Sequence, residues 1–477
     1  MYIRKIRLIN FKRFKDAEID LSSKITVLLG PNSSGKSSVI KAILALKQTA
    51  SPANDGEPLA AQGEYVDLGI YKDYVLEHKV NENIELKLEL SSDANRFGWL
   101  HSNRKIEAVS FSLRLGHDVV TKQARLLGVS YSVDKDSGIY FDIDRKKTRD
   151  AFLVTPSKNA AKMIANRLFK SDQNEMKTQK IWKDGISTQI DGKYSFRPIE
   201  VGREKSPFSD YPILLVSEGV SSVLRAFDRD FYYVGPLRRS PARSYGRSGR
   251  LLAVGAAGEH TPSVLANLEA RAGKERSPTA FHKTRMKELK QWVSLLFPSR
   301  EVDAQSEEAL VKLLISRSDG QKEAISDVGF GVSQILPILV QMAVMPDDAT
   351  LLVEQPELHL HPSVQTKFAK VVAQACLSGR RVVMETHSEH FVRGLQLAIS
   401  EAQLIADGEN KISSDDISFL YIPEAPELPH RMDTNKWGEF KEKWPTGFFD
   451  EAYKLAKQLL INKAAASDLI NNSEESR

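Results

Sequence analysis

Short apolar runs and helical patterns alternate at both ends of the chain. The run 25-ITVLL-29 predicts a buried strand, and apolar residues at helical spacing follow it from Val39 to about Leu46. Two further buried strands are expected at 350-TLLVE-354 and 381-RVVME-385. Buried strands joined by helices are typical of an α/β fold, so we expect a central, mostly parallel sheet.

Alternating patterns predict a second β region near the N-terminus. The segments 2-YIRKIRLINF-11 and 17-AEIDL-21 predict paired strands that lead into the central sheet. Four later segments alternate polar with apolar residues. They predict an antiparallel meander with one polar face: 83-NIELKLEL-90, 107-EAVSFSLRL-115, 127-LGVSYSVD-134 and 138-GIYFDID-144.

The middle of the chain has weaker patterns. Residues 50–63 are rich in Pro, Gly, Ala and Asn, which predicts an exposed loop. Residues 157–229 are mixed and helical in places. The run 231-FYYVG-235 predicts another strand, and helical patterns return over residues 262–296.

Composition sets wide limits. The 477 residues, 41% hydrophobic and 27% charged, are ordinary for a soluble protein of roughly two to four domain-sized units. No apolar run is long enough to cross a bilayer, and the N-terminus lacks a secretory segment, so we expect a cytoplasmic protein without a membrane partner. The one cysteine, Cys376, excludes an internal disulfide, and its apolar neighbours indicate a core thiol. A net charge of +5 does not by itself indicate nucleic-acid binding.

The loop after the first central strand, 30-GPNSSGKSS-38, matches the phosphate-binding pattern G-x-x-x-x-G-K-[ST] between a strand and a helix. Its glycines let backbone N–H groups point inward, and the helix N-terminus adds positive charge. Lys36 is expected to reach the β and γ phosphates of ATP, and Ser37 to ligate Mg²⁺. The predicted phosphate-binding residues are Gly30, Pro31, Asn32, Ser33, Ser34, Gly35, Lys36, Ser37 and Ser38.

The strand that ends at Glu354 has the Walker B pattern, an apolar run that ends in an acidic residue. Glu354 is therefore expected to hold Mg²⁺ directly or through water. Because Lys36 and Glu354 are 318 positions apart, a large insertion must separate two halves of one sheet. The strand that ends at residue 385 carries His387 just beyond it, where an imidazole can hydrogen-bond the γ-phosphate or the attacking water.

A second anion-binding pattern lies in 325-ISDVGFGVSQILPILVQMA-343. Gly329, Gly331 and Ser333 precede or begin an apolar helix, and glycines, a hydroxyl and a helix N-terminus suit a phosphate. The same nucleotide cannot fill both sites of one monomer unless the chain folds back. We therefore expect a homo-oligomer, at least a dimer, in which this segment of one subunit covers the γ-phosphate held by another.

The order of these motifs resembles that of the ABC-type ATPase heads of the SMC, RecF and OLD groups. More closely, the chain is similar to prokaryotic AAA-labelled ATPases of the abortive-infection type, which share VGFGVSQILPI, EQPELHLHP and ETHSEH. The segment 437-WGEFKEKWPTGFFDEAYKLA-456 resembles the small tail domain of that subgroup. The resemblance implies an ABC-ATPase head with an antiparallel β subdomain and an inserted helical subdomain that carries the signature segment, here residues 325–343.

The predicted boundaries follow from this resemblance and from the pattern. They are an N-terminal ATPase lobe over residues 1–150, an inserted region with an arginine-rich loop over 151–300, a C-terminal ATPase lobe over 301–428, and a tail over 429–477. Members of the group include ATPase subunits of anti-phage systems such as Septu and PARIS. The resemblance thus implies a separately encoded effector, a nuclease or toxin, and a nucleic-acid or phage-protein trigger.

One position departs from the ABC pattern. Gln355 stands where these heads usually carry a catalytic glutamate. Glutamine can orient a water but cannot take its proton. Either Glu357 supplies the base, or hydrolysis is slow and bound ATP acts mainly as a clamp, which is the interpretation we favour.

The arginine-rich loop 236-PLRRSPARSYGRSGR-250 leaves the function open. Its arginines can follow a nucleic-acid backbone, bind an acidic partner, or remain solvated. We expect an ATP-gated sensor or scaffold of anti-phage defence; the alternative is a RecF- or SMC-like repair ATPase that acts directly on DNA. The long coiled coil of SMC proteins and the metal-binding nuclease domain of OLD proteins are not indicated by the sequence.

Overall fold

The computed structural model describes most of the chain. The described residues are 1–51, 54, 57–91, 108–133, 139–145, 151–162, 186–189, 210–249, 251–273, 280–317, 319–405, 410–444, 455, 457–459 and 462. Much of the predicted inserted region before residue 210 therefore lies outside the described residues, as do Arg250 and most of the predicted tail. The predicted domain boundaries stay predictions.

A six-stranded sheet forms the centre of the molecule. Its strands lie in the order β10 (Phe231–Val234), β15 (Thr350–Glu354), β16 (Arg381–Glu385), β3 (Ile25–Leu29), β17 (Ile417–Tyr421) and β18 (His430–Met432). All neighbours pair in parallel except β17 and β18. Every residue of β3, β15, β16 and β17 is buried, as expected of parallel strands covered on both faces.

The two faces of this sheet belong to two separate hydrophobic cores. Helix α1 (Lys36–Ala50) packs in the first core with Leu28, Leu352 and Val383 of the sheet. Helices α8 (Phe330–Val344), α9 (Pro362–Leu377) and α10 (Glu389–Ala402) pack in the second core, against Val27, Val353 and other residues of the opposite face. The helix after the phosphate loop and the helix of the signature segment therefore lie on opposite faces of the central sheet.

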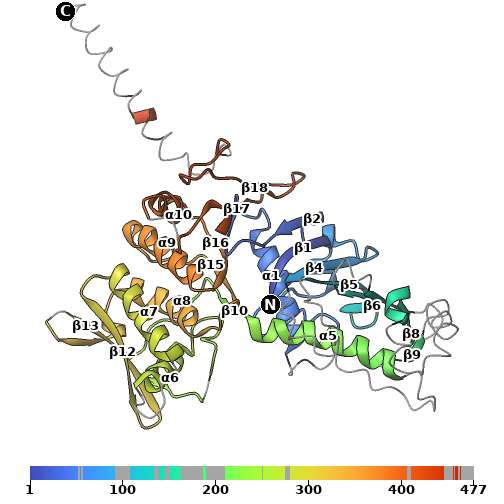
Figure 1. The fold of residues 1–477 in the computed structure, drawn as a ribbon, viewed down its shortest axis with the longest axis horizontal. Helices are drawn as coiled ribbons and strands as arrows, with labels where there is room; N and C mark the ends of the chain where they lie inside the picture. Colours follow the sequence, from blue (N-terminus) through green and yellow to red (C-terminus); the bar gives the residue numbers. More distant parts are fainter. Residues whose placement is uncertain are drawn as a thin grey trace, which may run out of the picture.

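An antiparallel sheet forms the other side of the first core. Its eight strands lie in the order β2 (Phe14–Asp20), β1 (Tyr2–Phe11), β4 (Ile84–Ser91), β5 (Ala108–His117), β6 (Ala124–Val133), β7 (Ile139–Arg145), β8 (Ala151–Pro156) and β9 (Ile186–Gln189). Burial alternates strictly along β4, which leaves one polar face. Figure 1 shows this sheet beside the central one, with helix α5 (Asp210–Asp230) running along it.

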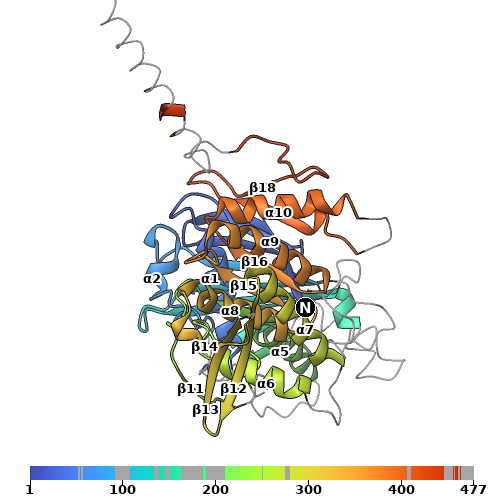
Figure 2. The same cartoon turned by 90° about the vertical axis from the view of Figure 1, so that its left-hand side faces the viewer.

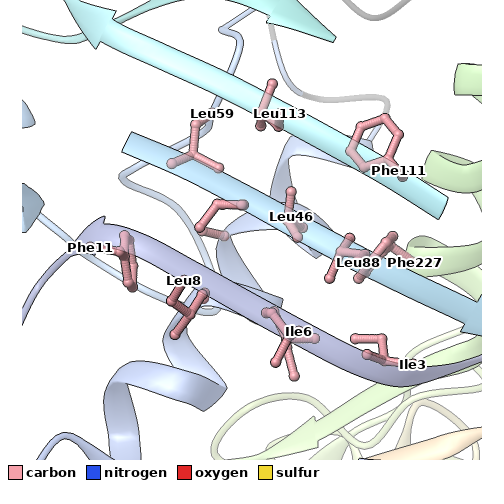
Figure 3. Close-up of a cluster of buried hydrophobic side chains, with 14 of the residues drawn as sticks. Ile3, Ile6, Leu8, Phe11, Leu46, Leu59, Leu88, Phe111, Leu113 and Phe227 are labelled. Carbon is pink, nitrogen blue, oxygen red and sulfur yellow. The ribbon is translucent and has the colours of Figure 1, made fainter. Parts of the chain in front are cut away.

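The first core explains why α1 is buried almost all round. Figure 3 shows side chains of β1, such as Ile6 and Leu8, close to Leu88 of β4 and Leu113 of β5. Leu46 of α1 and Phe227 of α5 contribute to the same cluster. A helix that packs between two sheets must bury more than one stripe, so its hydrophobic residues extend beyond an amphipathic pattern.

A smaller lobe packs on the second core. It contains helices α6 (Thr261–Gly273) and α7 (Ala280–Leu296), which the pattern predicted, and a sheet that it did not predict. This sheet consists of β11 (Tyr245–Gly246), β12 (Arg300–Glu307), β13 (Leu310–Arg317) and β14 (Lys322–Ala324). Figure 2 shows the long β12–β13 hairpin extending from the helices. The hairpin was not predicted because its apolar and polar residues alternate over only a short stretch and many of its residues are polar.

The structure confirms the predicted α/β fold with a mostly parallel central sheet and an antiparallel β region. One local prediction is wrong: residues 50–63 are not simply an exposed loop, because Leu59, Ala60 and Ala61 are buried. The side chain of Gln48 donates hydrogen bonds to the carbonyl oxygens of Ala60 and Val66, which ties this segment to α1. Within the described part of the chain, no helix has both the length and the apolar character needed to span a bilayer.

Candidate nucleotide-binding site

The phosphate loop joins β3 to α1 and depends on two glycines. Gly30 has φ of 141°, and a Cβ atom there would lie 2.1 Å from the carbonyl oxygen of Ile422. Gly35 has φ of 97°, and a Cβ atom there would lie 2.6 Å from Cδ of Arg13. Only glycine tolerates both the positive φ and such close approaches. The loop therefore needs glycine at these two positions.

The ammonium group of Lys36 lies inside this loop. Its Nζ donates hydrogen bonds to the carbonyl oxygens of Gly30 at 2.9 Å and Pro31 at 2.7 Å. Burial lowers the pKa of Lys36, and the negative charge of Glu385 opposes this shift. The first turn of α1, which is described in full, carries no acidic side chain. The lysine and the helix N-terminus thus present positive charge where a polyphosphate would bind.

The other loop residues divide by exposure. Asn32 and Ser33 are exposed, Ser34 is buried, and Ser37 and Ser38 are half-buried at the start of α1. Arg13, which sequence reasoning did not assign to the site, donates hydrogen bonds to the carbonyl oxygen of Ser34 and, at 2.5 Å, to that of Pro423. The only signal for Arg13 was its place two residues after the predicted strand 2-YIRKIRLINF-11.

Two carboxylates lie in register beside the phosphate loop. Glu354 pairs with Glu385 across β15 and β16, and Glu385 pairs with Leu28 across β16 and β3. Leu352 and Val383, two residues earlier on the two strands, pack in the first core. Because side chains alternate along a strand, Glu354 and Glu385 also face the α1 side of the sheet.

Tyr233 of β10 holds the Walker B acid from the other side. Its hydroxyl donates a hydrogen bond to Oε1 of Glu354 at 2.7 Å. Burial raises the pKa of Tyr233, and the charge of Glu354 raises it further, so the phenol stays protonated and donates. Burial also raises the pKa of Glu354, whereas the bond from Tyr233 lowers it. Tyr233 is a second residue that the motifs missed.

The chain turns sharply after Glu354. Gln355 adopts φ of 44°, a left-handed conformation that costs a residue other than glycine about 1–2 kcal/mol. Its backbone N–H donates a hydrogen bond to the carbonyl oxygen of Glu385 at 2.8 Å, which fixes the turn against β16. This places Gln355 at the carboxyl edge of the sheet, next to both acids.

Both oxygens of Glu357 accept hydrogen bonds from the switch segment, the residues after β16 that include Thr386 and the switch histidine, His387. Oε1 accepts a hydrogen bond from the backbone N–H of His387 at 2.7 Å, and Oε2 accepts one from the hydroxyl of Thr386 at 2.8 Å. Burial raises the pKa of Glu357, while these bonds lower it. In this arrangement Glu357 positions the switch segment, and its oxygens are engaged in doing so.

His387 lies at the same edge as the phosphate loop. Burial lowers its pKa, and the positive charge of Lys36 lowers it further, so the imidazole is neutral near pH 7. Ser388, the next residue, caps α10 by accepting a hydrogen bond from the backbone N–H of Phe391 at 2.9 Å. The cap fixes where the strand ends and the helix begins. The structure thus brings together Lys36, Glu354, Gln355, Glu357 and His387 at the carboxyl ends of β3, β15 and β16.

The signature segment lies apart from this cluster. Its helix α8 covers the face opposite α1, and Phe330 in the first turn is 60% exposed. A Cβ atom on Gly331 would lie 3.2 Å from the carbonyl oxygen of His359, whereas one on Gly329 would meet no atom within 4 Å. The hydroxyl of Ser333 donates a hydrogen bond to the carbonyl oxygen of Phe330 at 2.8 Å. The turn is therefore presented at the surface, and the phosphate contacts of Gly329, Gly331 and Ser333 stay predictions.

The arginine-rich loop divides between the interior and the surface. Arg238 is 7% exposed, and its Nη2 donates hydrogen bonds to the carbonyl oxygens of Glu354 at 2.8 Å and Gln355 at 3.3 Å. Burial lowers its pKa to about 10. Arg243 pairs with Asp327, just before the signature turn, at 3.1 Å. Arg238 is thus a support of the Walker B segment and not part of a surface that could follow nucleic acid.

The residues present fit a magnesium ion that a nucleotide brings with it. Ser37 offers a hydroxyl at the start of α1, and Glu354 offers a carboxylate at the end of β15, on the face of the sheet that α1 covers. Among the described residues, no three His, Cys, Asp or Glu side chains are grouped so that they could hold a metal ion by themselves. Mg²⁺ usually takes one or two carboxylates and completes its shell with water and phosphates, which suits this donor set.

The family described as AAA ATPase domain matches residues 1–209 and 259–392 of the chain. The chain belongs to this family. The prediction of an ATPase domain is confirmed at this level, and ATP with Mg²⁺ is the ligand expected for the site of this AAA ATPase.

More distant similarities are to proteins named DNA replication and repair protein RecF. The protein from Cytophaga hutchinsonii is 31% identical over 90 residues, which are 18% of this chain and 24% of the relative. The protein from Clostridium tetani is 28% identical over 92 residues, again 18% of this chain and 24% of the relative. The matched segment therefore spans about a quarter of either relative.

Among solved structures, the AAA ATPase is similar to SMC head domains. The head domain from Thermotoga maritima has 12% sequence identity and a TM-score of 0.37, and the match covers 91% of this chain and 100% of that one. The Smc head domain with an extended coiled coil bound to the C-terminal domain of ScpA, derived from Pyrococcus furiosus, has 10% identity and a TM-score of 0.43, with coverage of 96% and 99%.

Proposed function

We propose that this AAA ATPase binds ATP with Mg²⁺ and hydrolyses it slowly to ADP and phosphate, and that ATP joins two or more copies head to head. The observation that carries the proposal is the placement of α1 and α8 on opposite faces of the central sheet. Each helix begins in a pattern that suits a phosphate, but one nucleotide in one chain would meet only the first. A second copy would supply the second.

The slow turnover follows from the residues at the Walker B end. Gln355 cannot accept the proton of the attacking water. Both oxygens of Glu357 are bound to the switch segment. Positioning and charge stabilisation still allow phosphoryl transfer. The ATP-bound assembly would therefore be long-lived, but it would still hydrolyse its ATP.

We further propose that the long-lived assembly is a sensor or scaffold of anti-phage defence, which holds or activates a separately encoded nuclease or toxin. This step is supported by the resemblance of the segments around Gly329, Glu354 and His387 to abortive-infection ATPases. The trigger would be a nucleic acid or a phage protein.

The first experiment tests the assembly. Size-exclusion chromatography with light scattering would measure the mass of the protein with ATP, with ADP and without nucleotide. We expect a larger assembly with ATP alone, and no shift for Lys36→Ala, which lacks the phosphate-binding ammonium. A mass that is the same in all conditions would contradict the proposal.

The second experiment tests the role. The chain would be expressed together with the protein encoded next to it, and phage plating efficiency would be compared between the wild type and Lys36→Ala. Protection that depends on Lys36, and ATP-dependent co-purification of the neighbour, would support defence.

The similarity to RecF proteins supports a second candidate, an ATPase that acts directly on DNA. Arg239 and Arg247 of the arginine-rich loop are exposed and could contact phosphates. If they do, affinity for duplex DNA should fall steeply with salt, and Arg239→Glu with Arg247→Glu should abolish it. Tight, salt-dependent DNA binding without a protein partner would favour this candidate over the first.

A further inference from the structure

Glu385 is a buried acid on the strand next to the phosphate-loop strand, yet no sequence motif assigns it a role. It lies on β16, between the phosphate-loop strand β3 and the Walker B strand β15. Strands in a sheet are about 4.8 Å apart. The Glu385 position is therefore one strand from β3, whereas Glu354 is two strands away.

The side chain of Glu385 faces the nucleotide side of the sheet. It shares a row with Leu28 and Glu354, and this row faces α1, the helix that begins with Lys36 and Ser37. In this row Glu385 lies between Glu354 and Leu28 of β3, the strand whose following loop leads to Lys36 and Ser37. Glu385 is therefore closer in the sheet to the phosphate-loop strand than the Walker B acid is.

One oxygen of Glu385 has no partner within the described part of the chain. Glu385 is 4% exposed, and its Oε2 atom is buried without a hydrogen bond. An unsatisfied buried carboxylate oxygen is costly, and a second carboxylate directly across the strand pair adds repulsion. Two adjacent buried carboxylates become favourable where a cation, or water bound to a cation, lies between them.

The nearest cation of the protein does not complete it. The charge of Glu385 acts to raise the pKa of Lys36. The Nζ atom of Lys36 nevertheless donates its hydrogen bonds to the carbonyl oxygens of Gly30 and Pro31 in the loop. Among the ion pairs of the described residues, Lys36 forms none with Glu385. A structural lysine–glutamate pair thus does not account for this acid.

We propose that Glu385 is a second acidic residue of the magnesium site, which binds the Mg²⁺ of the nucleotide, or water that the ion carries, together with Ser37 and Glu354. The inference rests on the proposed ATP site. It explains a buried oxygen without a partner, a like-charged neighbour and a position between the phosphate-loop strand and the Walker B strand. When bound, the ion would neutralise the acid pair and hold the phosphates against the loop.

The test uses Glu385→Gln, which keeps the size of the side chain and removes its charge. Binding of a fluorescent ATP analogue would be measured as Mg²⁺ is titrated, and again in EDTA. We expect the half-saturating Mg²⁺ concentration to rise about 10- to 100-fold. Binding in EDTA should not weaken, because without the metal the carboxylate offers the phosphates only a like charge.

A thermal melt without nucleotide distinguishes a metal-binding residue from a residue that only stabilises the fold. Removing one of two adjacent buried charges should leave the melting temperature of Glu385→Gln unchanged or higher. The control is Glu401→Gln, at an exposed acid that pairs with Lys370 on the surface, and it should alter neither measurement.

Three outcomes would overturn the inference. An unchanged Mg²⁺ titration would do so, and so would an equal loss of binding in Mg²⁺ and in EDTA. A clearly lower melting temperature of Glu385→Gln without nucleotide would make Glu385 a structural residue instead of a metal residue. If the wild type itself failed to bind the ATP analogue, the proposed function would fall; if only the effect of Glu385→Gln were absent, this inference alone would fall.

Discussion

Oε1 of Glu357 accepts a hydrogen bond from the backbone N–H of His387 at 2.7 Å. This bond joins the segment after the Walker B strand to the segment after the next strand, 30 residues further along the chain. Movement of one segment must therefore affect the other. The relationship makes Glu357 the mechanical link between the acidic end of β15 and the switch histidine, whatever residue orients the attacking water.

Glu357→Gln should lower steady-state ATP turnover only about fivefold, because glutamine keeps one acceptor and loses about one hydrogen bond of ~1 kcal/mol. Gln355→Glu should raise turnover, since it introduces a carboxylate where a base is missing. A steady-state ATPase assay of both variants tests these expectations. A loss of about a hundredfold or more for Glu357→Gln alone would identify Glu357 as the base and refute the assignment to Gln355.

Arg238→Ala should destabilise the protein by about 2 kcal/mol and lower ATP turnover at least tenfold, because two backbone carbonyls of the Walker B segment lose their donor. The neighbouring Arg239 is exposed, so Arg239→Ala is a matched control that should change neither quantity. Chemical denaturation and the ATPase assay provide the two measurements. Equal behaviour of the two variants would show that the buried guanidinium does not support the site.

Gly329→Asp should leave the isolated subunit stable to within about 0.5 kcal/mol, because a Cβ atom there would lie in open space. It should nevertheless abolish ATP-dependent assembly, since it places a negative charge where the γ-phosphate of another subunit is expected. Gly273→Asp, at another open and exposed glycine, is the control. Thermal melts and light scattering measure the two effects. ATP-dependent assembly of Gly329→Asp at wild-type affinity would argue against a contact at this turn.

Glu269 of α6 should make stability depend on pH. Burial raises its pKa from 4.5 to about 7, although both oxygens accept the backbone N–H of Ala304 at 3.1 Å. Because the folded-state pKa is raised, its stabilising contribution is present below pH 4.5 and is lost as the pH rises towards 7.

Glu269→Gln removes this charge, so the variant should gain about 1 to 2 kcal/mol over the wild type between about pH 5 and pH 8, after allowance for solvent screening. Urea denaturation at both pH values measures the difference. The exposed Glu308, replaced by glutamine, is the control. A constant difference between Glu269→Gln and the wild type across this range would contradict the raised pKa.

The sequence predicted those parts of the site whose chemistry is local. Glycines, a lysine and a hydroxyl within nine positions suffice to indicate a phosphate loop, and an acid at the end of an apolar run indicates Walker B. The parallel strands β3, β15 and β16 could be predicted because all of their residues are buried, which leaves a largely apolar run, whereas the equally buried β17 was missed. The hairpin of β12 and β13 was not predicted, because only every second residue of β13 is buried and β12 is largely polar.

The residues that were missed depend on long-range register. Tyr233 contacts Glu354, which lies 121 residues further along the chain, only because β10 pairs with β15. In the sequence Arg238 belongs to an arginine cluster that suggests a surface. Only the structure shows that it is buried and binds the Walker B segment. Glu385 ends an apolar run next to a conspicuous histidine, and only the pairing of β16 with both β3 and β15 reveals its position.

Mixing two inactive variants tests the composite site most directly. Lys36→Ala removes the phosphate lysine, and Gly329→Asp blocks the signature turn; each alone should lack ATPase activity. In mixed dimers one of the two sites contains both an intact Lys36 and an intact Gly329, so an equimolar mixture should recover about a quarter of wild-type activity. No recovery, with mixed dimers verified by native mass spectrometry, would contradict a site shared between subunits.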